Sequence, residues 1–126
     1  MSVEIDLYAH LSIYAGLTAL IDSRIYPLKA PQEVTVPYCV YQIISEQRFY
    51  SHGGFSNLSR LRMQISAYGN TELQVSQVAE QVIMSMEAWP SANANVQASQ
   101  QENTFNAYED ITGLFYMPID FFVFYG

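Results

Sequence analysis

The residues best able to do chemistry in this chain of 126 residues are two histidines, His10 and His52, and one cysteine, Cys39. His52 follows Ser51 and precedes two glycines, so it could act as a base for a neighbouring serine. However, the G-x-S-x-G turn that presents a catalytic serine is absent, and a loop tip with two glycines would hold a base loosely. We therefore interpret His52 as a solvated loop residue.

Metal, phosphate and acid–base sites have equally little support. Two separated histidines and one cysteine match no zinc spacing, the acids form no EF-hand loop, and no glycine-rich phosphate loop is present. The pair Glu109-Asp110 and the separate Asp120 could serve as two catalytic carboxylates. Nothing in the sequence brings them into one pocket, and we interpret them as solvated acids. The sequence thus predicts no catalytic residues, no metal site, no cofactor and no enzyme.

Arginines in the first half have simple local interpretations. Arg24 follows Asp22 by two residues, so it could close a local ion pair or hold the proline-rich connection that comes next. Ligand binding by Arg24 is the remaining alternative. Arg48, Arg60 and Arg62 could gather near one hairpin, because paired strands bring such positions together. A solvated or interface face is the expected setting for them.

Composition predicts a packed core in one domain covering residues 1–126. Half of the residues are hydrophobic and 14% are aromatic, which argues against disorder. Ten tyrosines suit the edges of cores and subunit interfaces. Cys39 cannot form an internal disulfide and is expected to be a buried, unreactive thiol. Without disulfides, a signal peptide or an apolar stretch of ~20 residues, we expect folding in a reducing cytoplasm and no membrane contact.

Charge is unevenly distributed along the chain. Residues 1–62 contain all five basic residues and five acids, whereas residues 63–126 contain seven acids and no base, which accounts for the net charge of −7. Binding to nucleic acid requires clustered cations that displace the counterions of the phosphates. We therefore expect no direct, sequence-specific contact with nucleic acid. An acidic surface is compatible with a passage through which DNA slides without sticking.

Two helical segments are predicted near the N-terminus. Leu7, Leu11 and Tyr14 form one apolar stripe of a first helix. Gly16 weakens that helix, so a short second piece should follow and end near Asp22.

A longer helix is predicted in the middle of the chain. Residues 71–74 fit a capping box, and Pro90 should stop the helix after Trp89. Between these signals the apolar residues recur every three or four positions, as a helix with one buried face requires: Val75, Val78, Ala79, Val82, Ile83 and Met86.

Four strands complete the predicted fold. They cover residues 38–49, residues 60–68, part of the polar segment 93–106, and residues 114–125. Pro118 lies inside the last strand, where it should mark an edge or a bulge rather than a fully paired central position. The predicted class is α+β, in the order α-β-β-α-β-β, with helices on one face of an antiparallel sheet of about four strands.

Two stretches of the chain resemble the phage tail completion family, also described as head–tail joining proteins. The first begins with Asp22-Ser23-Arg24-Ile25-Tyr26-Pro27-Leu28 and continues from Pro37 through Gln42; the second is Asp110-Ile111-Thr112-Gly113-Leu114-Phe115-Tyr116, leading into residues 119–121. Cys39 and the run Phe115-Tyr116-Met117-Pro118 depart from the family pattern, which leaves the partner surface of the last strand open.

This resemblance implies a structural protein of a bacteriophage or prophage virion, located in the tail or neck and assembled in the cytoplasm of the bacterial host. It also implies a subunit that assembles with itself, usually as a hexameric ring, between tail-tube and head-connector proteins. The family offers no catalytic residues. A tail terminator, which caps the tail tube, has a related α+β fold and is the first alternative. A monomeric module that binds a peptide or small ligand through its tyrosines is the alternative from another class.

Two segments are candidate interface regions. The last strand is apolar on both faces, because Phe122 and Phe124 lie on the face opposite its main apolar row. A small domain with such a strand needs a partner surface to cover it. The second region is the glycine-containing loop tip, with residues Ser51, His52, Gly53, Gly54 and Phe55.

Overall fold

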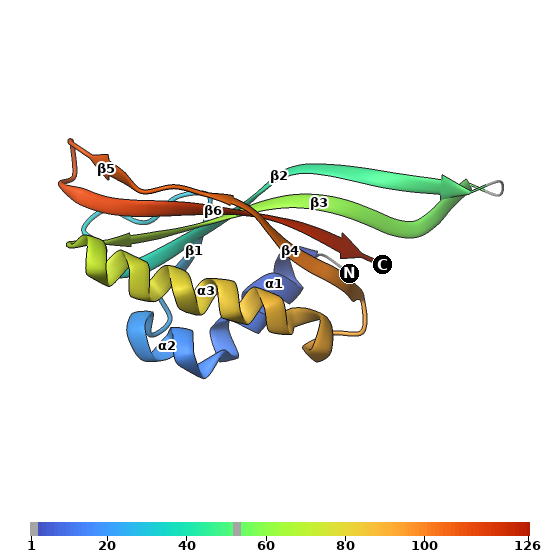
Figure 1. The fold of residues 1–126 in the computed structure, drawn as a ribbon, viewed down its shortest axis with the longest axis horizontal. Coiled ribbons are helices and arrows are strands. Elements are labelled where there is room, and N and C mark those ends of the chain that lie inside the picture. The colour runs from blue at the N-terminus through green and yellow to red at the C-terminus, as the bar shows by residue number, and fades with distance from the viewer. Residues whose placement is uncertain (1–2, 52–53) are drawn as a thin grey trace.

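The computed structural model describes residues 3–51 and 54–126, without the side chains of residue 51 and residues 54–57. It has an α+β fold in which all three helices pack on one face of a twisted sheet (Figure 1). The elements along the chain are α1 (Val3–Ile13), α2 (Ala15–Ile21), β1 (Ile25–Pro27), β2 (Tyr38–Ser51), β3 (Gly54–Gly69), α3 (Glu72–Ala92), β4 (Val96–Thr104), β5 (Ala107–Glu109) and β6 (Leu114–Tyr125).

The sheet is larger and more varied than the sequence predicted. Its strand order is β1-β2-β3-β6-β4, and β5 pairs with the other end of β6 on the same side as β4. The four predicted strands are present and antiparallel, but the prediction of an antiparallel sheet of about four strands was wrong in two respects. β1 and β5 add two strands of three residues each, and β1 pairs with β2 in parallel. Such short strands carry too few residues for an alternating pattern to be recognised.

β2 and β3 form a hairpin that extends beyond the rest of the sheet (Figure 1). β6 accompanies β3 only as far as the pair Ser59–Tyr125. Beyond this pair, residues 49–51 and 54–58 have only each other as strand neighbours within the described chain. We call this projecting part of the hairpin the arm.

The core lies between the sheet and the helices. Two helical segments are present as predicted, but they separate at Tyr14 rather than at Gly16, which lies inside α2. They contribute Leu7, Leu11, Leu17 and Ile21 to the core. α3 contributes one continuous buried face that ends at Trp89. Opposite these helices lie the inward side chains of the long strands, which are Cys39, Tyr41, Leu61, Met63, Ile65, Ala67, Ile119, Phe121 and Val123. The predicted buried position of Cys39 is confirmed.

The start of α3 has one of the two contacts of a capping box and a variant of the other. The Thr71 hydroxyl accepts a hydrogen bond from the backbone N–H of Gln74 at 3.1 Å. The Gln74 side chain in turn accepts the backbone N–H of Asn70 at 2.8 Å. The first bond satisfies a donor that the helix start would otherwise leave without a partner, and the second ties the chain before the helix to its first turn.

The prediction that Pro90 ends the helix was wrong. α3 continues to Ala92, and the N–H of Asn93 donates to the carbonyl of Trp89 at 3.0 Å. Proline removes one backbone donor, and in the last turn of a helix few further bonds depend on it.

Pro118 occupies a central strand, because β6 lies between β3 and the β4 side of the sheet. The pairing on that side is nevertheless interrupted at this point. β4 pairs as far as Thr104 with Ile119, and β5 resumes with Ala107 opposite Tyr116. The missing N–H of proline therefore coincides with a gap between two short partner strands.

Candidate assembly interface

The helices leave the opposite face of the sheet uncovered by secondary structure (Figure 1). We call this the outer face. It carries aromatic side chains at both ends and a polar group in the middle, and each part comes from neighbouring strands in register.

Four tyrosines cross one end of the outer face. Tyr38 stacks on Tyr68 with 4.8 Å between ring centroids, and Tyr68 stacks on Tyr116 at 5.3 Å. Tyr26 of β1 meets Tyr38 edge-on at 6.1 Å. Because the three stacked residues are direct partners in the β2, β3 and β6 register, strand pairing alone brings them together.

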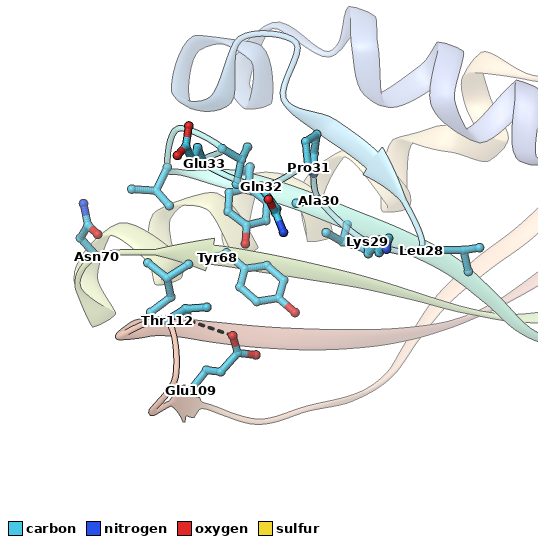
Figure 2. Close-up of a pocket in the computed structure, with 15 residues that line it drawn as sticks. Leu28, Lys29, Ala30, Pro31, Gln32, Glu33, Tyr68, Asn70, Glu109 and Thr112 are labelled. Carbon is cyan, nitrogen blue, oxygen red and sulfur yellow. Dashed lines mark hydrogen bonds between the residues drawn. The ribbon is translucent and has the colours of Figure 1, made fainter.

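A pocket of about 640 Å³ opens beside these rings (Figure 2). Its walls are the connection between β1 and β2, the rings of Tyr38 and Tyr68, Glu109 at the end of β5, and Thr112 in the turn that follows. Glu109 accepts a hydrogen bond from the Thr112 hydroxyl at 2.7 Å. We call this the tyrosine pocket.

The hydroxyl groups in the tyrosine pocket are held in the neutral form. Burial, the neighbouring Tyr68 and the Glu109 carboxylate raise the pKa of Tyr38 to about 12. Burial and Glu109 also raise the pKa of Tyr68. These phenols therefore stay protonated to a higher pH than ordinary tyrosines and keep an O–H group that can donate a hydrogen bond.

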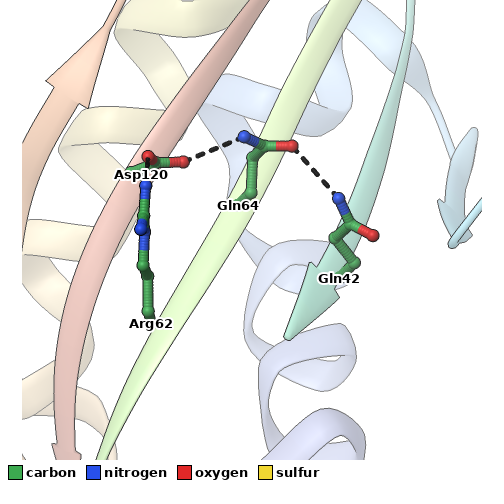
Figure 3. Close-up of polar contacts among 4 residues, drawn as sticks. All are labelled: Gln42, Arg62, Gln64 and Asp120. Carbon is green, nitrogen blue, oxygen red and sulfur yellow. Dashed lines mark hydrogen bonds and ion pairs between the residues drawn. The ribbon is translucent and has the colours of Figure 1, made fainter. Parts of the chain in front are cut away.

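The middle of the outer face contains a chain of polar contacts across three strands (Figure 3). Asp120 is 5% exposed, accepts from Arg62 at 2.7 Å and accepts from Gln64 at 3.0 Å. Gln42 donates to the other end of Gln64 at 3.1 Å. The interpretation of Asp120 as a solvated acid was therefore wrong, because its cross-strand neighbours supply donors for both carboxylate oxygens.

The arm end of the outer face carries a second aromatic group. Phe124 stacks on Phe49 with centroids 6.4 Å apart, and the Arg60 guanidinium lies 3.9 Å from the centre of the Phe122 ring. Phe122 and Phe124 are half-buried. We call Phe49, Phe122 and Phe124 the phenylalanine patch.

The remaining candidate interface residues lie at the arm. Ser51 pairs with Gly54, and Phe55 pairs with Tyr50. His52 and Gly53 lie outside the described residues, so the interpretation of His52 remains a prediction.

The arginines divide between the two faces. Arg24 makes both predicted contacts, an ion pair with Asp22 at 3.3 Å and a hydrogen bond to the carbonyl of Pro37 at 2.9 Å. Arg60 and Arg62 share the outer face. Arg48 pairs with Ser59 next to Arg60, so all three gather at the hairpin as predicted, although Arg48 lines a hollow on the helix side.

The predicted carboxylate candidates do not come together. Glu109 lines the tyrosine pocket, Asp110 is exposed in the adjacent turn, and Asp120 belongs to the polar group on β6. In residues 3–51 and 54–126, no three His, Cys, Asp or Glu side chains are grouped so that they could hold a metal ion. The helices of this part of the chain are also too short or too polar to cross a bilayer.

Comparison with known proteins identifies the family. The model of the family described as tail completion protein gp17 matches residues 5–125, almost the whole chain. The chain belongs to this family.

A solved structure shares the fold of this tail completion family member. It is a chain from a structure titled "Virion of native gene transfer agent (GTA) particle". The two chains are 13% identical, and the match has a TM-score of 0.72 over 94% of this chain and 90% of the other. No match was found among curated proteins. Family membership supports a structural role in a phage-like tail or virion.

Proposed function

We propose that this tail completion family member joins or completes the tail at the junction between head and tail of a long-tailed bacteriophage or prophage. The proposal rests on the family match over residues 5–125. In this role the protein assembles as a ring between tail-tube and head-connector proteins. It does so in the cytoplasm of the bacterial host and remains in the neck of the virion.

The outer face and the arm support an assembly role. The phenylalanine patch exposes ring surface beside the arm, and the arm has no further strand neighbour in the described chain. Apolar rings and open strand edges are surfaces that a neighbouring subunit can cover. We propose that Phe122, Phe124 and the tip residues Ser51 to Phe55 make subunit or neck contacts.

Electron microscopy of particles made without this protein tests the role. Filled heads and tails of normal length that remain unjoined are expected for a completion protein. Tubes longer than normal would instead identify a tail terminator, the alternative with a related architecture. Normal infectious particles would contradict both roles.

A second candidate function follows from the tyrosine pocket. A pocket of about 640 Å³ lined by phenols has the size and polarity of a site for a peptide or small ligand. This function requires a protein that remains monomeric in the presence of tail and head proteins. Sedimentation of the protein mixed with particles that lack it separates the two functions, because a structural subunit will cosediment with them.

A further inference from the structure

The two ends of the outer face differ in charge. The arm and its base, residues 44–62, contain three arginines and one glutamate, which gives a net charge of +2. The opposite end contains Lys29, Glu33, Glu109 and Asp110 around the tyrosine pocket, which gives a net charge of −2. The arm lies at the end of the sheet opposite the β5–β6 turn (Figure 1). One molecule thus presents a basic end and an acidic end.

The tyrosine pocket has the chemistry of a site for a guanidinium group. Figure 2 shows Tyr68 between the connection that carries Glu33 and the turn that carries Glu109. Lys29 also lies on the rim, so the two carboxylates leave the pocket with a formal charge of −1. A guanidinium is planar, donates five N–H groups, packs on aromatic rings and pairs with carboxylates.

Two arginines that could supply such a guanidinium group lie at the base of the arm. Arg48 pairs in register with Ser59, and Arg60 follows directly on β3, so the two lie close together. They point to opposite faces of the hairpin, Arg48 into the helix-side hollow and Arg60 over Phe122. Arg48 also lies 3.7 Å from the Glu46 carboxylate, but both of these side chains are exposed to solvent. Arg62 is held more closely, at 2.7 Å by the buried Asp120.

We propose that the tyrosine pocket receives an arginine, Arg48 or Arg60, from the base of the arm of a second copy of this chain, with Glu109 as its ion-pair partner. This contact rests on the proposed function, since it specifies how neighbouring subunits of the ring meet. It joins unlike surfaces, the basic end of one copy and the acidic end of the next. Head-to-tail contacts of this kind close into rings when the rotation between copies permits.

Charge reversal on each side tests the contact. The variants are Glu109→Arg, the double variant R48E/R60E, and the three changes combined. Sedimentation equilibrium at low ionic strength measures association of the purified protein over a concentration series. Glu109→Arg and R48E/R60E are each expected to weaken association by about tenfold or more, because each places like charges in contact. The combined variant should restore association, since the ion pair is re-formed with reversed signs.

Two further variants separate loss of contact from loss of fold. Glu80→Arg reverses an exposed acid on α3, away from the pocket, and should leave association unchanged. Glu109→Gln keeps the side-chain shape and should weaken association less than Glu109→Arg while leaving the melting temperature close to wild type.

Three results would overturn this contact. They are a wild-type protein that remains monomeric at every concentration, unchanged association in Glu109→Arg and R48E/R60E, and a combined variant that fails to restore association. None of these results would alter the particle phenotype on which the proposed function depends, so the two proposals fail separately.

Discussion

Asp120 shows how single side chains stabilise the outer face. Its carboxylate lies among aromatic and aliphatic neighbours on β6, yet both oxygens are hydrogen-bonded to side chains of β3. Burying a carboxylate is costly unless donors replace the lost water. Arg62 remains 44% exposed along its side chain, so solvent weakens the ion pair itself. The hydrogen bonds to the buried carboxylate therefore contribute more to the stability of the sheet than the attraction between the two charges.

Replacing Asp120 with alanine should lower the free energy of unfolding by about 1–3 kcal/mol, since Gln64 and Arg62 lose a buried acceptor. Urea denaturation at pH 7 measures the change. Asp110→Ala, in the exposed turn, is the matched control and should change stability by less than about 0.5 kcal/mol. Equal stability of the two variants would mean that the polar group does not stabilise the sheet.

At the scale of elements, β6 is the strand that joins the two sides of the sheet. It pairs with β3 on one side and with β4 and β5 on the other. One of its faces completes the core through Ile119, Phe121 and Val123. Its other face carries Phe122 and Phe124, which remain half-buried. The same strand therefore serves both folding and the proposed assembly.

Substitution of Phe122 or Phe124 with aspartate should shift the assembled protein to monomers and leave the fold intact, because these rings lie outside the core cluster. Light scattering measures the mass, and circular dichroism reports the fold. Phe121→Asp is the matched control in the same strand. Phe121 is 1% exposed in the core, so that variant should fail to fold. Unfolding of the Phe122 and Phe124 variants, without a folded monomer, would identify both rings as core.

At the scale of the whole molecule, the arm is separate from the body that the helices stabilise. Of the arm residues whose side chains are described, Phe49, Tyr50 and Leu58, none belongs to the buried core cluster. Two-stranded ribbons are marginally stable in water by themselves. A neighbouring subunit that covers the arm would supply the contacts that this chain does not.

Replacing residues 49–58 with Asn-Gly should join Arg48 to Ser59 through a tight turn and leave the body folded. The melting temperature should change by less than about 5 °C, since little buried apolar surface is lost. Association, measured by sedimentation, should fall to the monomer. A large loss of thermal stability would show instead that the arm belongs to the folded body.

Local sequence patterns were enough to predict the long helix and the long strands of this protein. The 3-4 spacing of apolar residues predicted α3, strict alternation predicted β3, and aromatic and β-branched runs predicted β2 and β6. Each of these patterns continues along most of its element, because the helices and the long strands each bury one face against the same core. The arm, β1 and β5 were missed because short or solvent-exposed strands carry no such repeat. The prediction for Pro90 was wrong because the free energy by which a proline destabilises a helix depends on how many helical residues follow it.

Only the tertiary structure decided which side chains meet. The stacked rings of Tyr38, Tyr68 and Tyr116 come from three strands, and the register of the sheet alone brings them into contact. The same is true of Asp120 with Arg62, and of Glu109 beside the tyrosine pocket. Sequence patterns report the face on which a residue lies, because burial acts on each strand separately. Contacts across strands depend on register, bulges and the path of the connection between β1 and β2, which no single segment encodes.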